Sequence, residues 1–185
     1  MTGACVMRAG TVILMVAISG SLDADAGRRN APPPPTPKLE SLHVDSETKL
    51  WTVQEVVPVE GVSAKDLFSR GRAWVATTYL SANDVVQLTD ADAGRLIAKG
   101  QTSIPWTMIR LLVWHTVTLE VKEGRYRVTV SDFQLSSETD TWRQSLETER
   151  WSNSPKVLER VDSEIAGLLA SLRKGMTAPV SESDW

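Results

Sequence analysis

Two stretches of alternating apolar and polar residues, joined by a short turn with a glycine, constrain the fold of this 185-residue chain more than any other feature. The stretch from Met108 to Val121 indicates one long strand, and the stretch from Arg125 to Leu135 indicates a second. Between them, Glu123-Gly124 matches a two-residue hairpin turn, because glycine adopts the positive φ that such turns require. The sequence therefore predicts a long antiparallel hairpin, and the turn sets which side chains lie opposite each other.

The register of this hairpin predicts one apolar face. If the turn has two residues, Lys122 faces Arg125, and the positions further along that share a face pair apolar side chains. Those pairs are Val121 with Tyr126, Leu119 with Val128, and Val117 with Val130. We expect the helices of the fold to pack on this continuous apolar face.

The next position on that face brings His115 opposite Asp132, unless a bulge intervenes. An imidazole beside a carboxylate can act as a general base, so this pair is the candidate catalytic site of a small hydrolase. We favour a structural hydrogen bond at the end of the core instead. The reason is that no serine or metal-ligand pattern accompanies the two residues.

The other face of the hairpin is polar near the turn and apolar further along. Near the turn, Arg125 and Arg127 could bind an anion, but pairing with Glu120 is the simpler interpretation. Further along, an apolar patch is a candidate binding surface. It is expected to pair Trp114 with Phe133 and Leu112 with Leu135.

An exposed apolar patch of this kind needs a cover. Residues 136–153 could fold back over it with Trp142 or Trp151. A partner protein, a second copy of the chain or an apolar ligand could bind there instead. As a third arrangement, a bulge would turn the histidine–aspartate pair outward and Trp114 inward.

The remaining periodic segments predict two helices and three further strands. Ser63 is typical of a helix N-cap, and Ser154-Pro155 begins a last helix that ends at Gly175. The strands are expected over Lys49–Val59, Val85–Leu88 and Arg95–Ile104. The order strand, helix, four strands, helix predicts an α+β fold.

Several of these segments resemble a known family. They are Lys65 to Trp74, Ser81 to Leu88, Gly94 to Gly100 and Val121 to Arg127. They are similar to the family called domain of unknown function 4468. The resemblance implies a TBP-like fold, in which a curved antiparallel sheet carries both helices on one face. It also implies an exported bacterial protein, and it provides no catalytic residue because the family has no assigned activity.

The N-terminus predicts export. Arg8 precedes an apolar run, Ala9 to Leu22, that is shorter than the about 20 residues needed to span a bilayer. Small residues follow, so we expect residues 1–26 to be a signal peptide cleaved after Ala26, with an uncleaved membrane anchor as the alternative. The single cysteine, Cys5, precedes the apolar run, which disfavours a lipoprotein. The mature protein is expected in the periplasm or outside the cell.

After cleavage, three parts are expected. Residues 27–47 contain four consecutive prolines and predict a stiff tether. Residues 48–175 form the α+β domain. Residues 176–185 are polar and acidic and predict a disordered tail, in which docking of Trp185 is the less favoured interpretation.

Charge and composition argue against several classes of function. The net charge of −3 gives no electrostatic reason to expect nucleic-acid binding, and export argues against it as well. The two histidines and the absent cysteine ligands give no metal-site spacing, so neither metal nor cofactor is expected. The leading hypothesis is a non-enzymatic binding domain of the cell envelope, and the alternative is the hydrolase described above.

Overall fold

A computed structural model describes residues 36–79, 86–139 and 142–178 of the chain. The long strands are β2 (Trp51–Pro58), β3 (Val86–Asp90), β4 (Arg95–Trp106), β5 (Ile109–Lys122) and β6 (Arg125–Ser137). The short strands are β1 (His43–Val44) and β7 (Gln144–Ser145). The helices are α1 (Ala64–Thr78), the short α3 (Glu149–Ser152) and α4 (Pro155–Thr177).

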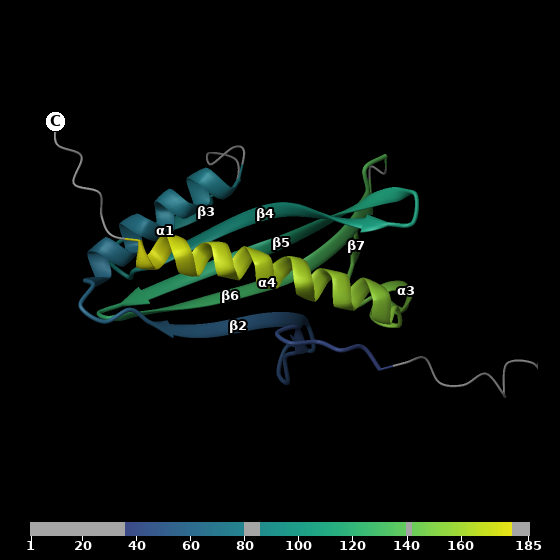
Figure 1. Cartoon of the computed structure of the whole chain (residues 1–185), viewed down its shortest axis with the longest axis horizontal. Helices are drawn as coiled ribbons and strands as arrows, with labels where there is room; N and C mark the ends of the chain where they lie inside the picture. The colour runs from purple at the N-terminus through teal and green to yellow at the C-terminus, as the bar shows by residue number, and fades with distance from the viewer. Residues whose placement is uncertain (1–35, 80–85, 140–141, 179–185) are drawn as a thin grey trace, which may run out of the picture. The chain divides into compact units, whose positions relative to one another are not determined.

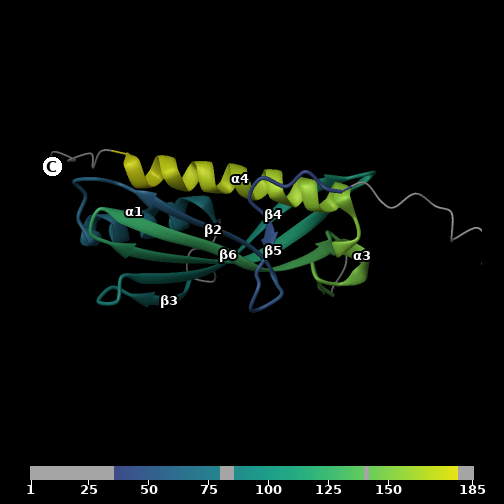
Figure 2. The same ribbon diagram turned by 90° about the horizontal axis from the view of Figure 1, so that it is seen from below.

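The strands form one antiparallel sheet in the order β1-β2-β6-β5-β4-β3, and β7 pairs with β6. The helices α1 and α4 lie against the same face of this sheet (Figure 1, Figure 2). The opposite face carries neither of these helices, and we call it the open face. The predicted α+β order is confirmed, and the structure adds β1, β7 and α3.

Helix α1 begins where the sequence predicts. The Ser63 hydroxyl accepts a hydrogen bond from the backbone N–H of Asp66 at 3.1 Å and donates to the Asp66 carboxylate at 2.7 Å. Gly71 lets the helix approach β5 closely, because a Cβ there would lie 2.3 Å from Cδ2 of Leu119. The helix therefore rests directly on the apolar face of the hairpin.

Helix α4 is longer than expected. It continues through Gly175 to Thr177, and Met176 is fully buried. Gly175 packs against the Trp74 ring of α1, so tertiary contact holds the last turn in place. The buried face of α4 consists of Val157, Leu158, Val161, Ile165, Leu169, Leu172 and Met176, with the buried carboxylate of Asp162 among them.

The hairpin register is confirmed from the turn to the middle of the strands. Gly124 has φ +68°, Lys122 pairs with Arg125, and the pairing runs on as predicted to Thr116 with Ser131. Beyond that point the register shifts, so that Trp114 pairs with Gln134. Asp132 lies at the shift with φ +56°, which marks it as the extra residue of a β-bulge.

Because of the bulge, the predicted apolar patch was wrong in two of its four residues. Phe133 and Leu135 were expected on the open face, but both are fully buried on the helix side. Leu112 and Trp114 stay half-buried on the open face. The extra residue shifts the alternation of β6 alone, so His115 remains inward and Asp132 turns outward. A bulge was one of the expected arrangements, but it moves residues of β6 rather than His115 and Trp114.

The chain itself covers Trp114, one of the two residues that remain in the patch. Residues that follow β6 fold back, and β7 pairs with β6 opposite Gln134 and Leu135. The Arg143 guanidinium lies 3.5 Å above the centre of the Trp114 ring. Trp151 is buried, whereas Trp142 remains 45% exposed. Arg143, and not either tryptophan, is therefore the side chain that stacks on Trp114.

Residues 38–47 were expected in the tether, yet they are part of the folded unit. The buried Asp162 carboxylate accepts hydrogen bonds from the backbone N–H groups of Glu40, Ser41 and Leu42, at 2.7, 3.0 and 2.7 Å. Leu42 is buried, and β1 follows it directly. The predicted signal peptide with Ala26, the proline run up to residue 35 and the predicted tail from residue 179 lie outside the described residues. In the described part of the chain, helices that combine the length and apolar character of a membrane span are absent.

Candidate functional site

His115 and Asp132 do not form the predicted pair. The Nε2 atom of His115 lies 2.9 Å from the hydroxyl of Tyr79, and Nδ1 lies 3.2 Å from the carbonyl oxygen of Val113. Both ring nitrogens are therefore engaged on the helix side. Asp132 is exposed on the open face, where Thr116 donates to it at 3.4 Å. The geometry that a hydrolase would need from this pair is missing.

Burial sets the charge of His115. The loss of hydration lowers its pKa from 6.5 to about 4, and the hydrogen bond to Val113 offsets this only in part. The imidazole is therefore neutral at pH 7, so Nδ1–H donates to Val113 and Nε2 accepts from Tyr79. Burial also raises the pKa of the Tyr79 hydroxyl, which stays protonated. The Tyr79–His115 pair is therefore a structural hydrogen bond inside the core. The favoured interpretation placed such a hydrogen bond between His115 and Asp132, and that partner was wrong.

A small cavity lies beside the bulge on the open face. It is lined by Lys99, Gly100, Trp114, His115, Thr116, Asp132, Gln134 and Arg143. Its volume of about 50 Å³ is room for one or two water molecules, which excludes an organic substrate. In the described residues, groups of three or more potential metal ligands are also absent.

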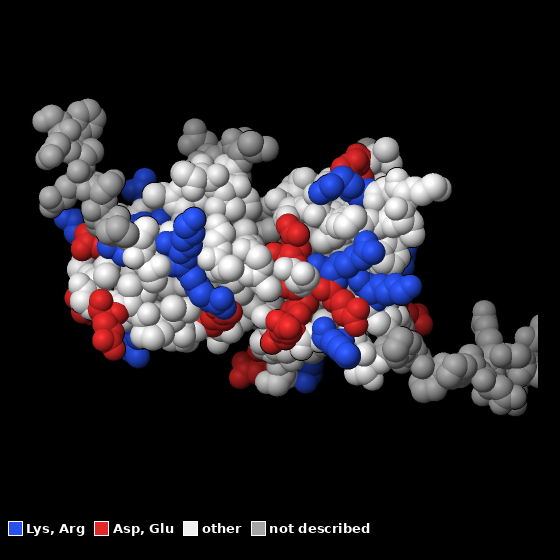
Figure 3. All heavy atoms as spheres, in the orientation of Figure 1, with Lys and Arg blue, Asp and Glu red and all other residues white. Residues whose placement is uncertain are grey.

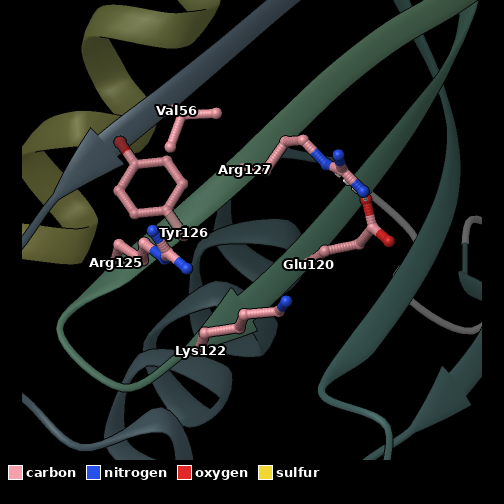
Figure 4. Close-up of a pocket in the computed structure, with 6 residues that line it drawn as sticks. All are labelled: Val56, Glu120, Lys122, Arg125, Tyr126 and Arg127. Carbon is pink, nitrogen blue, oxygen red and sulfur yellow. Dashed lines mark hydrogen bonds and ion pairs between the residues drawn. The ribbon is translucent and has the colours of Figure 1, made fainter.

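A larger groove lies on the open face near the β5–β6 turn. It has a volume of about 320 Å³, and its side chains come from β2, β5 and β6 (Figure 4). We call it the hairpin groove. Its lining residues are Val56, Glu120, Lys122, Arg125, Tyr126 and Arg127.

Basic side chains dominate the hairpin groove. Lys122 and Arg125 lie directly opposite each other in the register, although like charges in that position repel. In the next pair on the open face, Nε and Nη2 of Arg127 lie 2.8 and 2.6 Å from one carboxylate oxygen of Glu120. The expected Glu120–Arg127 pair is confirmed. Within the described residues, Lys122 and Arg125 make no ion pair.

This excess of cations is local. The whole chain has a net charge of −3, and acidic and basic side chains are mixed over the helix-covered side (Figure 3). In the hairpin groove, three cations face a single carboxylate. Arginine presents planar N–H donors that match carboxylate, sulfate and phosphate oxygens. The arrangement can therefore hold an anionic group of a ligand.

The sequence analysis named the basic side chains near the turn but did not predict that they line one groove. The Lys122–Arg125 pairing followed from the turn, and we interpreted the nearby arginines as satisfied by Glu120. One carboxylate can balance one guanidinium, and Arg127 occupies it. The sequence signal for the groove was the excess of three cations over one carboxylate on one face of the hairpin.

Comparisons with known proteins agree with this fold. The sequence model of the family described as "Domain of unknown function (DUF4468) with TBP-like fold" matches residues 54–136. The expected resemblance is confirmed. Two solved structures have the same fold. One is a DUF4468 family protein from Bacteroides ovatus, with TM-score 0.60 and 12% identity, covering 75% of this chain and 93% of that chain.

The other is a TBP-like protein from Parabacteroides distasonis, with TM-score 0.60 and 11% identity, covering 72% of this chain and 96% of that chain. The fold of this chain is therefore TBP-like. A comparison with curated proteins finds no match. Neither similarity assigns an activity, so the function has to be argued from this chain's own residues.

Proposed function

We propose that this chain is an exported, non-enzymatic binding domain that holds an anionic ligand in the hairpin groove. The observation that carries the proposal is the direct opposition of Lys122 and Arg125 beside Arg127. Such a pair of like charges costs roughly 0.2–1 kcal/mol of stability and contributes nothing to folding. A ligand that brings negative charge turns this repulsion into attraction.

The groove suits a phosphate, sulfate or carboxylate group. Glu120 holds the Arg127 guanidinium in place, while Lys122 and Arg125 beside it make no ion pair with another described residue. Charge-assisted hydrogen bonds to such groups are about twice as strong as neutral ones. Outside the cytoplasm, anionic glycans and lipid headgroups carry these groups, whereas nucleic acid does not fit the chain's net charge of −3.

The binding test uses pyrophosphate as the probe. We expect its addition to shift the amide NMR signals of Lys122, Arg125 and Arg127, and high salt to weaken the effect. The variant Lys122→Gln/Arg125→Gln should lose this response. It should also melt at a slightly higher temperature, since the repulsion is gone.

A matched control separates the groove from general charge. The variant Lys156→Gln/Lys174→Gln removes the same charge from exposed positions on α4. It should bind pyrophosphate as the unmodified chain does. Equal loss of binding in both double variants, or retained binding in the groove variant, contradicts the proposal.

Export has its own test. The order of basic residue, apolar run and small residues in residues 1–26 supports cleavage after Ala26. Mass spectrometry of the protein recovered from the envelope fraction should give a chain that starts at Gly27. A chain that retains Ala9–Leu22 in the membrane fraction would indicate the uncleaved anchor.

A further inference from the structure

A second groove lies between α1 and the turn that joins β3 to β4. Its volume is about 350 Å³, and Phe68 and Val121 give it an apolar base. Its other lining residues are Ala64, Lys65, Ser69, Arg72, Ala91, Asp92, Ala93 and Gly94. Small side chains leave room above the base, so a flat aromatic ring would fit. We call it the α1 groove.

Two cations line the α1 groove. Lys65 and Arg72 are both exposed, and they are seven residues apart, which places them on one side of the helix. Within the described residues neither makes an ion pair. Asp92 is the one carboxylate in the lining. The groove therefore suits an apolar group with negative charges next to it.

The chain beyond α4 has that chemistry. After the helix ends at Thr177, the sequence continues with residues 178–185, Ala-Pro-Val-Ser-Glu-Ser-Asp-Trp. Pro179 opposes continuation of the helix. Trp185 supplies an aromatic ring, and Glu182 and Asp184 supply two carboxylates close to it. The tail complements both the apolar base and the cations of the groove.

The tail is also long enough. The guanidinium of Arg70 donates to the carbonyl oxygen of Met176 at 2.6 Å, so α4 ends beside the first half of α1. The α1 groove lies on another side of these same turns, and a helix with its side chains is about 10–12 Å wide. The seven steps from Ala178 to Trp185 span up to about 23 Å when extended. The ring can therefore cross α1 and enter the groove.

We infer that Trp185 docks into the α1 groove of its own chain, with Glu182 and Asp184 beside Lys65 and Arg72. The tail then acts as an internal occupant that a competing acidic, aromatic segment would have to displace. The tail of a second copy is the alternative occupant, and the experiment below distinguishes the two.

Paramagnetic broadening tests the contact. A nitroxide is attached to Ser181→Cys in a Cys5→Ser chain, which has no other cysteine. We expect the amide signals of Lys65, Ala93 and Val121 to broaden, and the broadening to weaken at high salt. Adding Trp185→Ala should remove it, whereas Trp185→Phe should retain most of it. Unchanged thermal melting shows that these tail variants are folded.

Three results would overturn the inference. Broadening confined to the last turn of α4 means that the tail does not reach the groove. Equal broadening in the Trp185→Ala chain means that the ring does not anchor it. Broadening of an isotope-labelled chain by a separate nitroxide-labelled chain means that the tail docks between copies.

Discussion

The hydroxyl of Tyr79 lies 2.9 Å from Nε2 of His115, and this contact joins the end of α1 to the middle of β5. His115 is 2% exposed, and the Phe133 ring centre lies 6.4 Å from its own. Protonation of the imidazole would therefore place a positive charge in the buried core, which destabilises the folded chain.

Stability should fall as the pH drops from 6.5 to 4. The pKa of His115 is lowered to about 4 in the folded chain, against 6.5 when unfolded, so the unfolded chain binds the proton first. The neutral imidazole of His115 thus contributes about 3 kcal/mol to the free energy of unfolding. This contribution is complete above pH 6.5 and is lost as the pH falls from 6.5 to 4. Urea denaturation across this range measures it.

The variant His115→Gln isolates this effect. Its amide can accept the hydrogen bond from Tyr79 but does not titrate, so the slope between pH 6.5 and 4 should become much shallower. An unchanged slope in this variant would assign the pH dependence to carboxylates elsewhere.

Gly100→Ala should destabilise the fold by about 1–3 kcal/mol through overpacking. A Cβ at this position would lie 2.2 Å from Cε1 of Tyr79, whose ring covers the glycine. Thermal melting measures the loss. Gly167→Ala on α4 is the matched control: a Cβ there meets nothing within 4 Å, so the change should be neutral or stabilising. Equal effects of the two changes would contradict the close contact.

Asp162→Ala should release the segment that leads into β1. Three backbone N–H groups, of Glu40, Ser41 and Leu42, lose a charged acceptor, which costs about 3 kcal/mol. Hydrogen exchange should accelerate at Ser41 and Leu42 while β5 stays protected. The exposed Glu159 accepts a single hydrogen bond among the described residues, from the backbone N–H of Lys38 at 3.1 Å, so Glu159→Ala provides the control with a small effect. Protection of Ser41 and Leu42 in the Asp162→Ala chain would contradict this role.

Thr107→Gly should stabilise the β4–β5 hairpin. Thr107 has φ +48°, a conformation that costs a residue with a Cβ about 1–2 kcal/mol. Glycine removes this cost, so the melting temperature should rise. Thr139→Gly, at an exposed turn without positive φ, should give no gain. A lower melting temperature for Thr107→Gly would mean that the threonine makes a contact worth more than the strain.

The register of β6 shows how far sequence reasoning reached. The turn at Gly124 and the alternation from Val121 to Val117 placed the first half of the hairpin correctly. The second half was wrong, although a signal was present. The apolar positions of β6 change from even numbers, up to Val130, to odd numbers, from Phe133, with Asp132 between them. A change of parity within one strand indicates a bulge.

The sequence by itself determined the two long helices, the five long strands, their order and the burial side of β5, because side-chain periodicity and capping are local properties. Tertiary structure alone decided three things: which residue between Val130 and Phe133 forms the bulge, the stacking of Arg143 on Trp114, and the hydrogen bonds from residues 40–42 to Asp162. Each joins segments distant along the chain or follows from their packing. Placing Phe133 against the core outweighs the disruption of one strand pair, and the sequence of β6 alone contains no measure of that balance.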